Sequence, residues 1–456
     1  MTAGGLYPSQ LAMWRLEQEQ PGRRDCVVAA LVRLTGAVDV PALDAALTAV
    51  IARHEALRTG FTDRDGQPRT FVVPPPPGAL VVVDLRGRDV PRGETERLAR
   101  EHSATPFDLT APPLVRAALV RHSDREAVLS LAMHHLVTDG WSTAVVVREL
   151  AELYSARVLG RTPALAGPVR PYSEFAAERA AWFATPDAAA QLSACLRDLR
   201  GQRPLPVPVA GDAGTAAEPG DAVVTWFGEE LSGRVRRAAR AARTTPFVFL
   251  LATAYVWLAG LTGETDITLA SAMANRTRRA DEHVVGFLTN IVLLRARVPP
   301  SLPLVELLAT AGELVLTAYE RQAVPIEHVT DRLAAENPAA DVKPSVLFCA
   351  DNAAGVGWEF AGLTAEPLDR GWIVPKRPLS LFLQEQHGRL GVRLVYRTDV
   401  LGRGTARALG AAYRTLAERA ADRPAATVGS LLDGVPLVGT GPHRTFTPRP
   451  AHPARP

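Results

Sequence analysis

The alternation of apolar and polar positions predicts a chain that mixes strands and helices. Short runs of apolar and β-branched residues predict the strands Cys26–Thr35, Gln67–Val73, Leu80–Asp84 and Ala127–Met133. Apolar residues recurring every three or four positions predict the helices Pro41–Thr59 and Ser142–Val158. Further helices are expected at Ala188–Leu199 and Leu231–Arg243, and the apolar run Pro246–Leu261 follows Thr244-Thr245, which are plausible helix caps. The pattern therefore indicates an α/β protein.

Breaks in this pattern suggest how the chain is divided. The segment 204–220 is rich in proline, glycine and alanine, and a second round of strands and helices begins after it. We therefore expect a lobe at 1–175, a connecting helix and linker at 176–222, and a second lobe at 223–438. The residues 439–456 carry many prolines and few large apolar side chains, which predicts a disordered tail.

Side chains capable of acid–base chemistry are concentrated in His134-His135-Leu136-Val137-Thr138-Asp139-Gly140, which joins a predicted strand to a predicted helix. Backbone amides at a helix start lack intrahelical partners, and side chains on such a connection can face a cleft. Successive side chains of an extended segment point to opposite sides, so one histidine can face a substrate while the other packs inward. A neutral imidazole can accept a proton near pH 7.

This segment allows two interpretations. The histidines can be satisfied core residues in a tight turn, which is the common outcome for a lone buried histidine. We favour a catalytic pair, because a His-His-x-x-x-Asp-Gly run directly after a strand gathers acid–base groups at one point. Asp139 is expected to fix the loop, either by accepting backbone N–H bonds or by pairing with an arginine.

The composition narrows the class of protein. Hydrophobic residues make up 47% of 456 positions, which allows a sizeable core, and a net charge of +3 does not indicate nucleic acid. The three cysteines, Cys26, Cys195 and Cys349, form no metal-binding or redox motif, so we expect no metal and a reducing cytoplasm. The N-terminus lacks a secretory pattern, and the apolar run Pro246–Leu261 is short for a membrane span.

With its motifs taken together, the chain resembles the condensation domains of nonribosomal peptide synthetases, in the superfamily that includes chloramphenicol acetyltransferase. The resemblance rests first on His134–Gly140 and extends from about residue 5 to about residue 435. The other matching segments, in chain order, are Ser9–Trp14, Arg53–Phe61, Phe107–Leu109 with Pro113, Leu114 and Arg116, Tyr172–Phe175, Gly286–Asn290 with Leu294 and Arg295, and more weakly Gln322 with Pro325–Glu327.

The chain departs from the family at two places in its second half. Asp341–Ser345 replaces the Asn-Pro-Leu-Phe run of the seventh motif, and Pro378 stands where relatives usually carry an aspartate. Acceptor-side and bridging elements lie in this half of the family's fold. The departures therefore concern the acceptor and leave the expectation for His135 unchanged.

The resemblance implies α+β-type layers in two chloramphenicol acetyltransferase-like lobes, arranged as a V-shaped pseudodimer around a central tunnel. A carrier protein would deliver an acyl or aminoacyl thioester on its 4′-phosphopantetheine arm, and a nucleophile would enter from the other mouth. His135 would accept the nucleophile's proton or orient the nucleophile. The arm comes with the carrier, so the chain itself is expected to bind no cofactor.

The resemblance also suggests roles for other residues. The expected catalytic set is His135, His134, Asp139 and Gly140, with the Gly140 amide able to approach the thioester. Arg58 is the first candidate to hold Asp139, and Arg295 is the alternative. The candidates for contact with the substrate or its oxyanion are Ser142, Ser345 and Asn290.

The implied partners are a donor carrier protein and a small amine or alcohol acceptor, or alternatively a second carrier. We expect a cytoplasmic monomer that binds neither nucleic acid nor membrane. Five arginines crowd the predicted helix Leu231–Arg243, and we interpret them as a solvated face; the alternative is a docking patch for an acidic carrier. The five are Arg234, Arg236, Arg237, Arg240 and Arg243.

Other functions of the same fold stay open. A carrier-binding scaffold without chemistry often lacks the second histidine, which this chain keeps. An epimerase needs an additional glutamate base in the second lobe, for which Glu327 and Glu385 remain candidates. A third alternative is an acyltransferase of the same fold that uses a coenzyme A thioester. We expect a free-standing condensation enzyme without an adenylation or carrier domain, as some members of the family are. Val435–Leu437 resembles a linker toward an adenylation domain, so an excised synthetase domain is the alternative. Amide and ester products are both compatible with these motifs.

Overall fold

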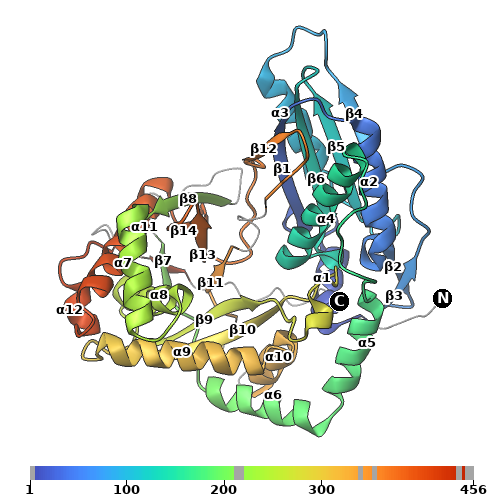
Figure 1. Cartoon of the computed structure of the whole chain (residues 1–456). Coiled ribbons are helices and arrows are strands. Elements are labelled where there is room, and N and C mark those ends of the chain that lie inside the picture. Colours follow the sequence, from blue (N-terminus) through green and yellow to red (C-terminus); the bar gives the residue numbers. More distant parts are fainter. Residues whose placement is uncertain (1–5, 210–219, 337–342, 352–356, 438–443, 447–456) are drawn as a thin grey trace. The chain divides into compact units, whose positions relative to one another are not determined.

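The computed structural model describes residues 6–209, 220–336, 343–351, 357–437 and 444–446. The predicted mixture of strands and helices is confirmed, and the chain forms two compact units, each with its own sheet (Figure 1). Unit 1 comprises Met1–Thr185, Ala274–Thr289 and Gly355–Gly371. Unit 2 comprises Pro186–Met273, Asn290–Ala354 and Trp372–Pro456.

Unit 1 is built on a five-stranded sheet with the order β12-β1-β6-β5-β4. β4 and β5 are parallel, and the other neighbours are antiparallel. The strands are β1 (Val27–Thr35), β4 (Leu80–Asp84), β5 (Val115–Arg121), β6 (Glu126–His134) and β12 (Thr364–Leu368). A separate hairpin pairs β2 (Thr59–Arg64) with β3 (Gln67–Val72).

The helices of unit 1 cover both faces of this sheet (Figure 1). The alternation of side chains along β1 assigns the faces: Val32 and Leu34 join the core beneath α2 and α4, whereas Leu31 joins the core beneath α3. The helices are α1 (Pro8–Glu19), α2 (Val40–Arg53), α3 (Arg92–Ala104), α4 (Gly140–Val158) and α5 (Tyr172–Phe183). The large buried face beneath α4 holds the beginning of this helix against the end of β6.

One predicted helix, Pro41–Thr59, is shorter in the structure. α2 ends at Arg53, His54 is extended, and η2 (Glu55–Arg58) is a short 3₁₀ turn. Arg58 lies at this break and donates hydrogen bonds to the carbonyls of Ile51 and Ala52, which are among the last of the helix. The buried apolar side chain of Leu57 therefore belongs to the turn and not to the helix.

Unit 2 is built on a six-stranded sheet with the order β10-β9-β11-β13-β14-β8. β11 runs parallel to both of its neighbours, and the other pairs are antiparallel. The strands are β8 (Gly220–Trp226), β9 (Asp266–Met273), β10 (Asn290–Arg297), β11 (Val346–Ala350), β13 (Leu379–Gln386) and β14 (Arg389–Arg397).

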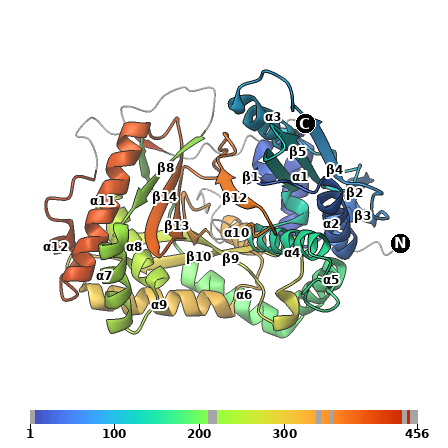
Figure 2. The same cartoon turned by 45° about the horizontal axis from the view of Figure 1, so that its top comes forward.

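Helix α8 (Pro246–Thr262) is the central helix of unit 2, as its continuous apolar sequence predicts. The Thr245 hydroxyl accepts a hydrogen bond from the Val248 N–H at its start, and Gly263 ends it in the left-handed conformation. Figure 2 shows α7 and α11 beside it on one side of the sheet. The remaining helices are α6 (Pro186–Leu199), α7 (Gly228–Ala241), α9 (Leu304–Glu320), α10 (Ile326–Glu336), α11 (Arg403–Asp422) and α12 (Val428–Leu432).

The division of the chain differs from the expected boundaries. The expected connection 176–222 divides at Thr185, with α5 in unit 1 and α6 in unit 2, and 274–289 and 355–371 return to unit 1. Within the expected tail, β15 (Arg444–Phe446) pairs with β7 (Val207–Val209), which corrects the prediction of disorder for these three residues. The rest of the tail lies outside the described residues.

In the part of the chain that the structure describes, no single helix is long and apolar enough to cross a membrane. The pair α7 and α8, bent by 99°, passes that test together by length and composition only.

Candidate active site

The histidine pair lies where β6 ends and α4 begins. His134 is the last residue of β6, opposite Val27 of β1, and His135 opens the 3₁₀ turn η3 (His135–Val137). Asp139 is the N-cap of α4, and its carboxylate accepts the Ser142 N–H at 2.7 Å. The predicted strand–turn–helix context of the motif is therefore confirmed.

The two histidine rings have different surroundings, as their neighbouring positions predict. His134 is 2% exposed, and its Nδ1 accepts the Leu136 N–H at 3.1 Å. Its Nε2 lies 3.3 Å from Oε1 of Glu17 and can donate to it. Both ring nitrogens are thus engaged inside the protein, which does not support the expected place of His134 in the catalytic set and favours a structural role.

His135 is only partly buried, and its Nδ1 lies 2.8 Å from the carbonyl oxygen of Thr138. A carbonyl oxygen can only accept, so Nδ1 carries the hydrogen and the basic lone pair of the neutral ring is on Nε2. The Phe287 ring packs against the imidazole with a centroid separation of 4.8 Å. The turn therefore fixes both the tautomer and the orientation of His135.

Asp139 is held by Arg276, a residue that the sequence analysis did not single out. Nη1 and Nη2 of Arg276 lie 3.0 and 3.1 Å from the two carboxylate oxygens, and both side chains are almost fully buried. Burial alone would raise the pKa of Asp139, but Arg276 and the hydrogen bond from the Ser142 N–H hold this pKa below its ordinary value. Asp139 is thus an ionised structural carboxylate.

The two arginines expected to hold Asp139 lie elsewhere, so both predictions are wrong. Arg58 donates to the carbonyls of Ile51, Ala52 and Val73, because the break after α2 leaves carbonyl oxygens that need donors. Arg295 belongs to unit 2, where its guanidinium pairs with the Asp266 carboxylate of the neighbouring strand at 2.7 Å. A signal for Arg276 existed, since Asn275-Arg276 lies just after the apolar strand β9, and the histidine pair likewise lies at the end of the apolar strand β6.

A loop from the distant motif Gly286–Thr289 is fastened to the start of α4. The N–H groups of Leu288 and Thr289 each donate to Oδ2 of Asp139 at 3.0 Å. Ser142 Oγ donates to the Gly286 carbonyl at 2.8 Å and accepts the Gly286 N–H at 3.0 Å. The loop therefore carries Phe287 to its position against His135.

Tyr172 contacts this loop at Gly286 and at Phe287. A Cβ atom on Gly286 would lie 2.0 Å from the Tyr172 ring, which leaves room only for glycine. The Tyr172 hydroxyl donates to the Phe287 carbonyl at 3.0 Å. The segments beginning at Tyr172 and Gly286, which are separate motifs in the sequence, thus meet in one place.

Ser142 and Asn290, expected as substrate or oxyanion contacts, are enclosed by protein. Ser142 is 0% exposed, and its hydroxyl also accepts a hydrogen bond from Arg276 at 2.8 Å. Asn290 is 1% exposed in unit 2, where its Nδ2 donates to the Gln322 carbonyl at 2.8 Å. Their burial and internal hydrogen bonds argue against direct contact with a substrate and indicate structural roles.

Gly140 differs from Gly286 in its surroundings. It is the exposed first residue of α4, and a Cβ atom there would meet no described atom within 4 Å. The φ angle of Gly140 does not lie in the positive, left-handed region either. Neither the backbone conformation nor a protein neighbour requires glycine, so the space beside the Gly140 backbone is open to a ligand.

Glu17, Cys26 and His134 form a buried group whose possible ligand atoms lie within 4.8 Å of one another. Burial opposes ionisation of Glu17, but hydrogen bonds from His134, the Cys26 thiol and the Gly22 N–H lower the pKa of Glu17 from its ordinary value. These hydrogen bonds give the three side chains a role without a metal. The contact between Cys26 and Glu17 is not indicated by the sequence.

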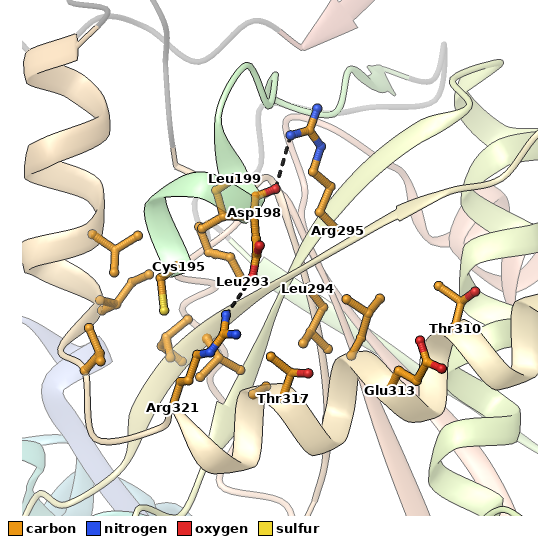
Figure 3. A pocket seen from close by; sticks show the side chains of 17 residues that line it. Cys195, Asp198, Leu199, Leu293, Leu294, Arg295, Thr310, Glu313, Thr317 and Arg321 are labelled. Carbon is orange, nitrogen blue, oxygen red and sulfur yellow. Dashed lines mark hydrogen bonds and ion pairs between the residues drawn. The ribbon is translucent and has the colours of Figure 1, made fainter. Parts of the chain in front are cut away.

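Unit 2 contains a cavity of about 230 Å³ between β10, α6, α9 and α10. Figure 3 shows Arg295 and Arg321 at this cavity, with Asp198 between them, and Cys195 nearby. Arg321 pairs with the Asp198 carboxylate at 2.6 Å, and Arg295 donates to the Asp198 carbonyl at 3.3 Å. The cavity is lined by unit 2 residues alone, whereas His135 belongs to unit 1.

A family model described as the condensation domain matches residues 5–433, nearly the whole chain. The chain belongs to the condensation domain family. One of the linear gramicidin synthase proteins of Brevibacillus parabrevis is 32% identical over 431 residues, which are 93% of this chain and 6% of that protein. Chondramide synthase of Chondromyces crocatus is 31% identical over 407 residues, 87% of this chain and 10% of that protein. The chain thus spans only a small part of these curated relatives.

Solved structures agree with this assignment. The first condensation domain of the calcium-dependent antibiotic synthetase has a TM-score of 0.79 at 23% identity, and the match covers 94% of this chain and 99% of that one. SgcC5 from Streptomyces globisporus has a TM-score of 0.70 at 28% identity, covering 88% of this chain and 94% of that one. The expected mixed α/β fold of a condensation domain is confirmed, and so is the general activity, because condensation domains are acyltransferases of nonribosomal peptide synthesis.

Proposed function

We propose that this condensation domain transfers an acyl or aminoacyl group from the phosphopantetheine thioester of a carrier protein to the amine or hydroxyl of a small acceptor. The observation that supports this most directly is the geometry of His135. Its Nδ1 hydrogen is committed to the Thr138 carbonyl, so Nε2 is the basic atom of a partly exposed ring.

In this proposal the nucleophile attacks the thioester carbonyl carbon while Nε2 of His135 accepts the proton of its N–H or O–H group. The carbon–sulfur bond then breaks, and the imidazolium returns the proton to the departing thiolate. The N–H at the open side of Gly140 lies at a helix start, where it favours developing negative charge on the carbonyl oxygen. General base catalysis typically contributes about 10²–10⁴-fold, and positioning supplies much of the rest.

Asp139 and Arg276 are proposed to act by position and not by proton transfer. Their buried pair fastens the loop that carries Phe287 against the His135 ring. An ionised carboxylate with this many donors has little tendency to accept a further proton. We therefore assign proton transfer to His135 alone.

The acceptor is proposed to be a small diffusing nucleophile, with a carrier-bound acceptor as the alternative. SgcC5, 28% identical to this chain, was solved in complex with (R)-(-)-1-(2-naphthyl)-1,2-ethanediol and sucrose, and the diol is a small molecule with hydroxyl groups. Three free cysteines fit the proposed cytoplasmic setting. Of the five arginines considered for carrier docking, Arg234 pairs with Glu418 and Arg236 with Glu385, which leaves less charge for a partner.

Two alternatives are less well supported by the described residues. Glu385, a candidate for an epimerase base, pairs with Arg236 at 2.8 Å on the surface of unit 2. A scaffold without chemistry has no need for the His135 tautomer that the Thr138 carbonyl fixes. A coenzyme A thioester remains a second donor to test, because it contains the same phosphopantetheine arm.

The test is a reconstituted reaction with a loaded carrier protein. Free amines and alcohols are offered in one set of reactions and an aminoacyl-carrier in another, and products are followed by mass spectrometry. We expect acyl transfer to a free acceptor, and octanoyl-coenzyme A replaces the carrier in a third set. Transfer to the carrier-bound acceptor alone would reject the small acceptor, and no transfer with any pair would reject the proposed reaction.

A further inference from the structure

Helix α1 of unit 1 buries polar side chains where a helix normally buries apolar ones. Its buried residues are Ser9, Gln10, Trp14 and Glu17, of which only Trp14 is apolar. Gln10 is 4% exposed, and Glu17 is 5% exposed. Glutamine and glutamate are seldom buried in proteins, because their polar groups lose water and need protein partners in exchange. The contacts of these two side chains therefore indicate the role of this face of α1.

Gln10 contacts the turn that carries His135. The side-chain Nε2 of Gln10 donates to the Leu136 carbonyl at 2.8 Å, although the two residues are 126 positions apart in the sequence. Leu136 is the middle residue of η3 and is 0% exposed. A buried carbonyl in such a short 3₁₀ turn needs a donor from another segment, and Gln10 supplies one. Both α1 and η3 belong to unit 1.

The N–H group of Leu136 is held from the same helix, but less directly. It donates to Nδ1 of His134 at 3.1 Å, and Nε2 of His134 lies 3.3 Å from Oε1 of Glu17. Gln10 and Glu17 lie on the same side of α1, because positions i and i+7 of a helix share one face. This face of α1 therefore holds the Leu136 carbonyl directly and the Leu136 N–H through His134.

Leu136 lies inside the short stretch of backbone that orients the His135 ring. The hydrogen bond between His135 Nδ1 and the Thr138 carbonyl, at 2.8 Å, closes a loop that contains Leu136. This hydrogen bond selects the tautomer with its hydrogen on Nδ1. The peptide unit after Leu136 forms part of the loop, so its orientation decides whether the Thr138 carbonyl stays within reach of the ring. A donor on the Leu136 carbonyl holds that peptide unit in place.

From this arrangement we propose that Gln10 is a positioning residue for acyl transfer. By holding the Leu136 carbonyl, Gln10 keeps the His135 ring in the tautomer whose basic atom is Nε2. Glu17 supports the same turn only through His134, so we assign Glu17 mainly to stability. The inference deepens the proposed function and rests on it for the general-base role of His135.

The first test removes the donor of Gln10 with little change in side-chain size. In Gln10→Leu we expect kcat for transfer from a loaded carrier to fall about 10- to 100-fold, because even a small displacement of a catalytic group is costly. KM for the carrier should change little, since Gln10 is buried and is not proposed to touch the substrate. Gln18→Leu makes the same substitution at an exposed position of α1 and is the matched control, which should keep the wild-type kcat.

Glu17→Leu provides the contrast within the same helix. It removes the acceptor of His134 Nε2 but leaves the contact of Gln10 with the turn in place. We expect a lower melting temperature, and a smaller loss of kcat in the folded fraction than in Gln10→Leu. Glu19→Leu, at an exposed position of α1, is the control and should keep both quantities. An equal loss of kcat in Glu17→Leu and Gln10→Leu would assign the effect to α1 as a whole and overturn the particular role of Gln10.

Nitrogen-15 NMR of the histidine rings measures the tautomer without turnover, so this readout remains even if no acceptor reacts. The His135 signals are identified by their absence in His135→Asn. We expect the neutral ring to carry its hydrogen on Nδ1 in the wild type, in Gln18→Leu and in Glu17→Leu, and a mixture of both tautomers in folded Gln10→Leu. A residue that served stability alone would leave the tautomer of the folded fraction unchanged.

The two readouts together separate this inference from the proposed function. If folded Gln10→Leu kept the Nδ1–H tautomer of His135, the positioning role of Gln10 would be overturned, whether or not kcat fell. If the tautomer changed and kcat fell, the proposal would be supported. A changed tautomer with wild-type kcat would support the positioning of the ring by Gln10 and would reject the general-base role of His135 in the proposed function.

Discussion

Arg276 and Asp139 form a buried bidentate ion pair between residues that are 137 positions apart in the sequence. The same carboxylate accepts the N–H groups of Ser142, Leu288 and Thr289, so one side chain joins the start of α4 to the loop that carries Phe287. The geometry of His135 therefore depends on a charge pair that acts through the backbone of this loop. The effect of this ion pair on stability and its effect on catalysis by His135 can be measured separately.

Removal of Arg276 should destabilise the protein strongly. Arg276→Ala leaves the Asp139 carboxylate buried without its cation, which costs about 3–5 kcal/mol in comparable pairs. Arg295→Gln is the control, because its pair with Asp266 is partly exposed and should contribute at most about 1 kcal/mol. Denaturant unfolding measures both. If Arg276→Ala and Arg295→Gln lost similar amounts of unfolding free energy, the buried pair would contribute no more to stability than the partly exposed one.

Stability should also depend on pH through Asp139. Its pKa is lower in the folded protein than its ordinary value, so its contribution is complete above that ordinary value and is lost as the pH falls through the folded pKa. Asp139→Asn should therefore be less stable than the wild type at neutral pH, and the difference should shrink in acid below about pH 4. Unfolding free energies at a series of pH values test this. If the difference in unfolding free energy between the wild type and Asp139→Asn grew toward low pH, the assigned direction of the Asp139 pKa shift would be wrong.

Gly286→Ala should destabilise the loop around Phe287. The added Cβ would lie 2.0 Å from the Tyr172 ring, and overpacking of this kind typically costs about 1–3 kcal/mol. Tyr172→Leu removes the ring and should recover part of that loss in the double variant, although it also removes the hydrogen bond to the Phe287 carbonyl. A double-mutant cycle in denaturant measures the coupling; strictly additive losses would show that the two residues do not clash.

Gly140→Ala should have opposite effects on stability and activity. The new Cβ meets no described atom, and alanine favours a helical position over glycine by about 0.5–1 kcal/mol. The proposed approach of the thioester to this backbone would be obstructed, so kcat/KM for acyl transfer should fall while the melting temperature stays equal or rises. Full activity in a folded Gly140→Ala protein would exclude a close approach at this residue.

The sequence predicts the context of the site better than its internal contacts. The strand, the turn and the helix around His134–Gly140 follow from apolar periodicity and from the cap at Asp139, which are local properties. The partner of Asp139 is a long-range contact, and the chain offers many arginines that local pattern cannot rank. The clash that requires Gly286 is likewise visible only when Tyr172 is placed beside it. Burial shows that Ser142 and Asn290 belong to the structure, although their place in the motifs suggested substrate contact.

The central prediction concerns the two ring nitrogens of His135. Asparagine places an amide donor near the position of Nδ1 and can keep the hydrogen bond to the Thr138 carbonyl, but it has no basic atom in place of Nε2. His135→Asn should therefore fold like the wild type and lose about 10²–10⁴-fold in kcat for acyl transfer. His134→Asn is the matched control, because it acts on the buried contact with Glu17 and should lower the melting temperature more than it lowers kcat in the fraction that folds. Circular dichroism and turnover with a loaded carrier separate these outcomes. Near wild-type turnover by His135→Asn would remove the general-base role and leave positioning of the nucleophile as the function of this turn.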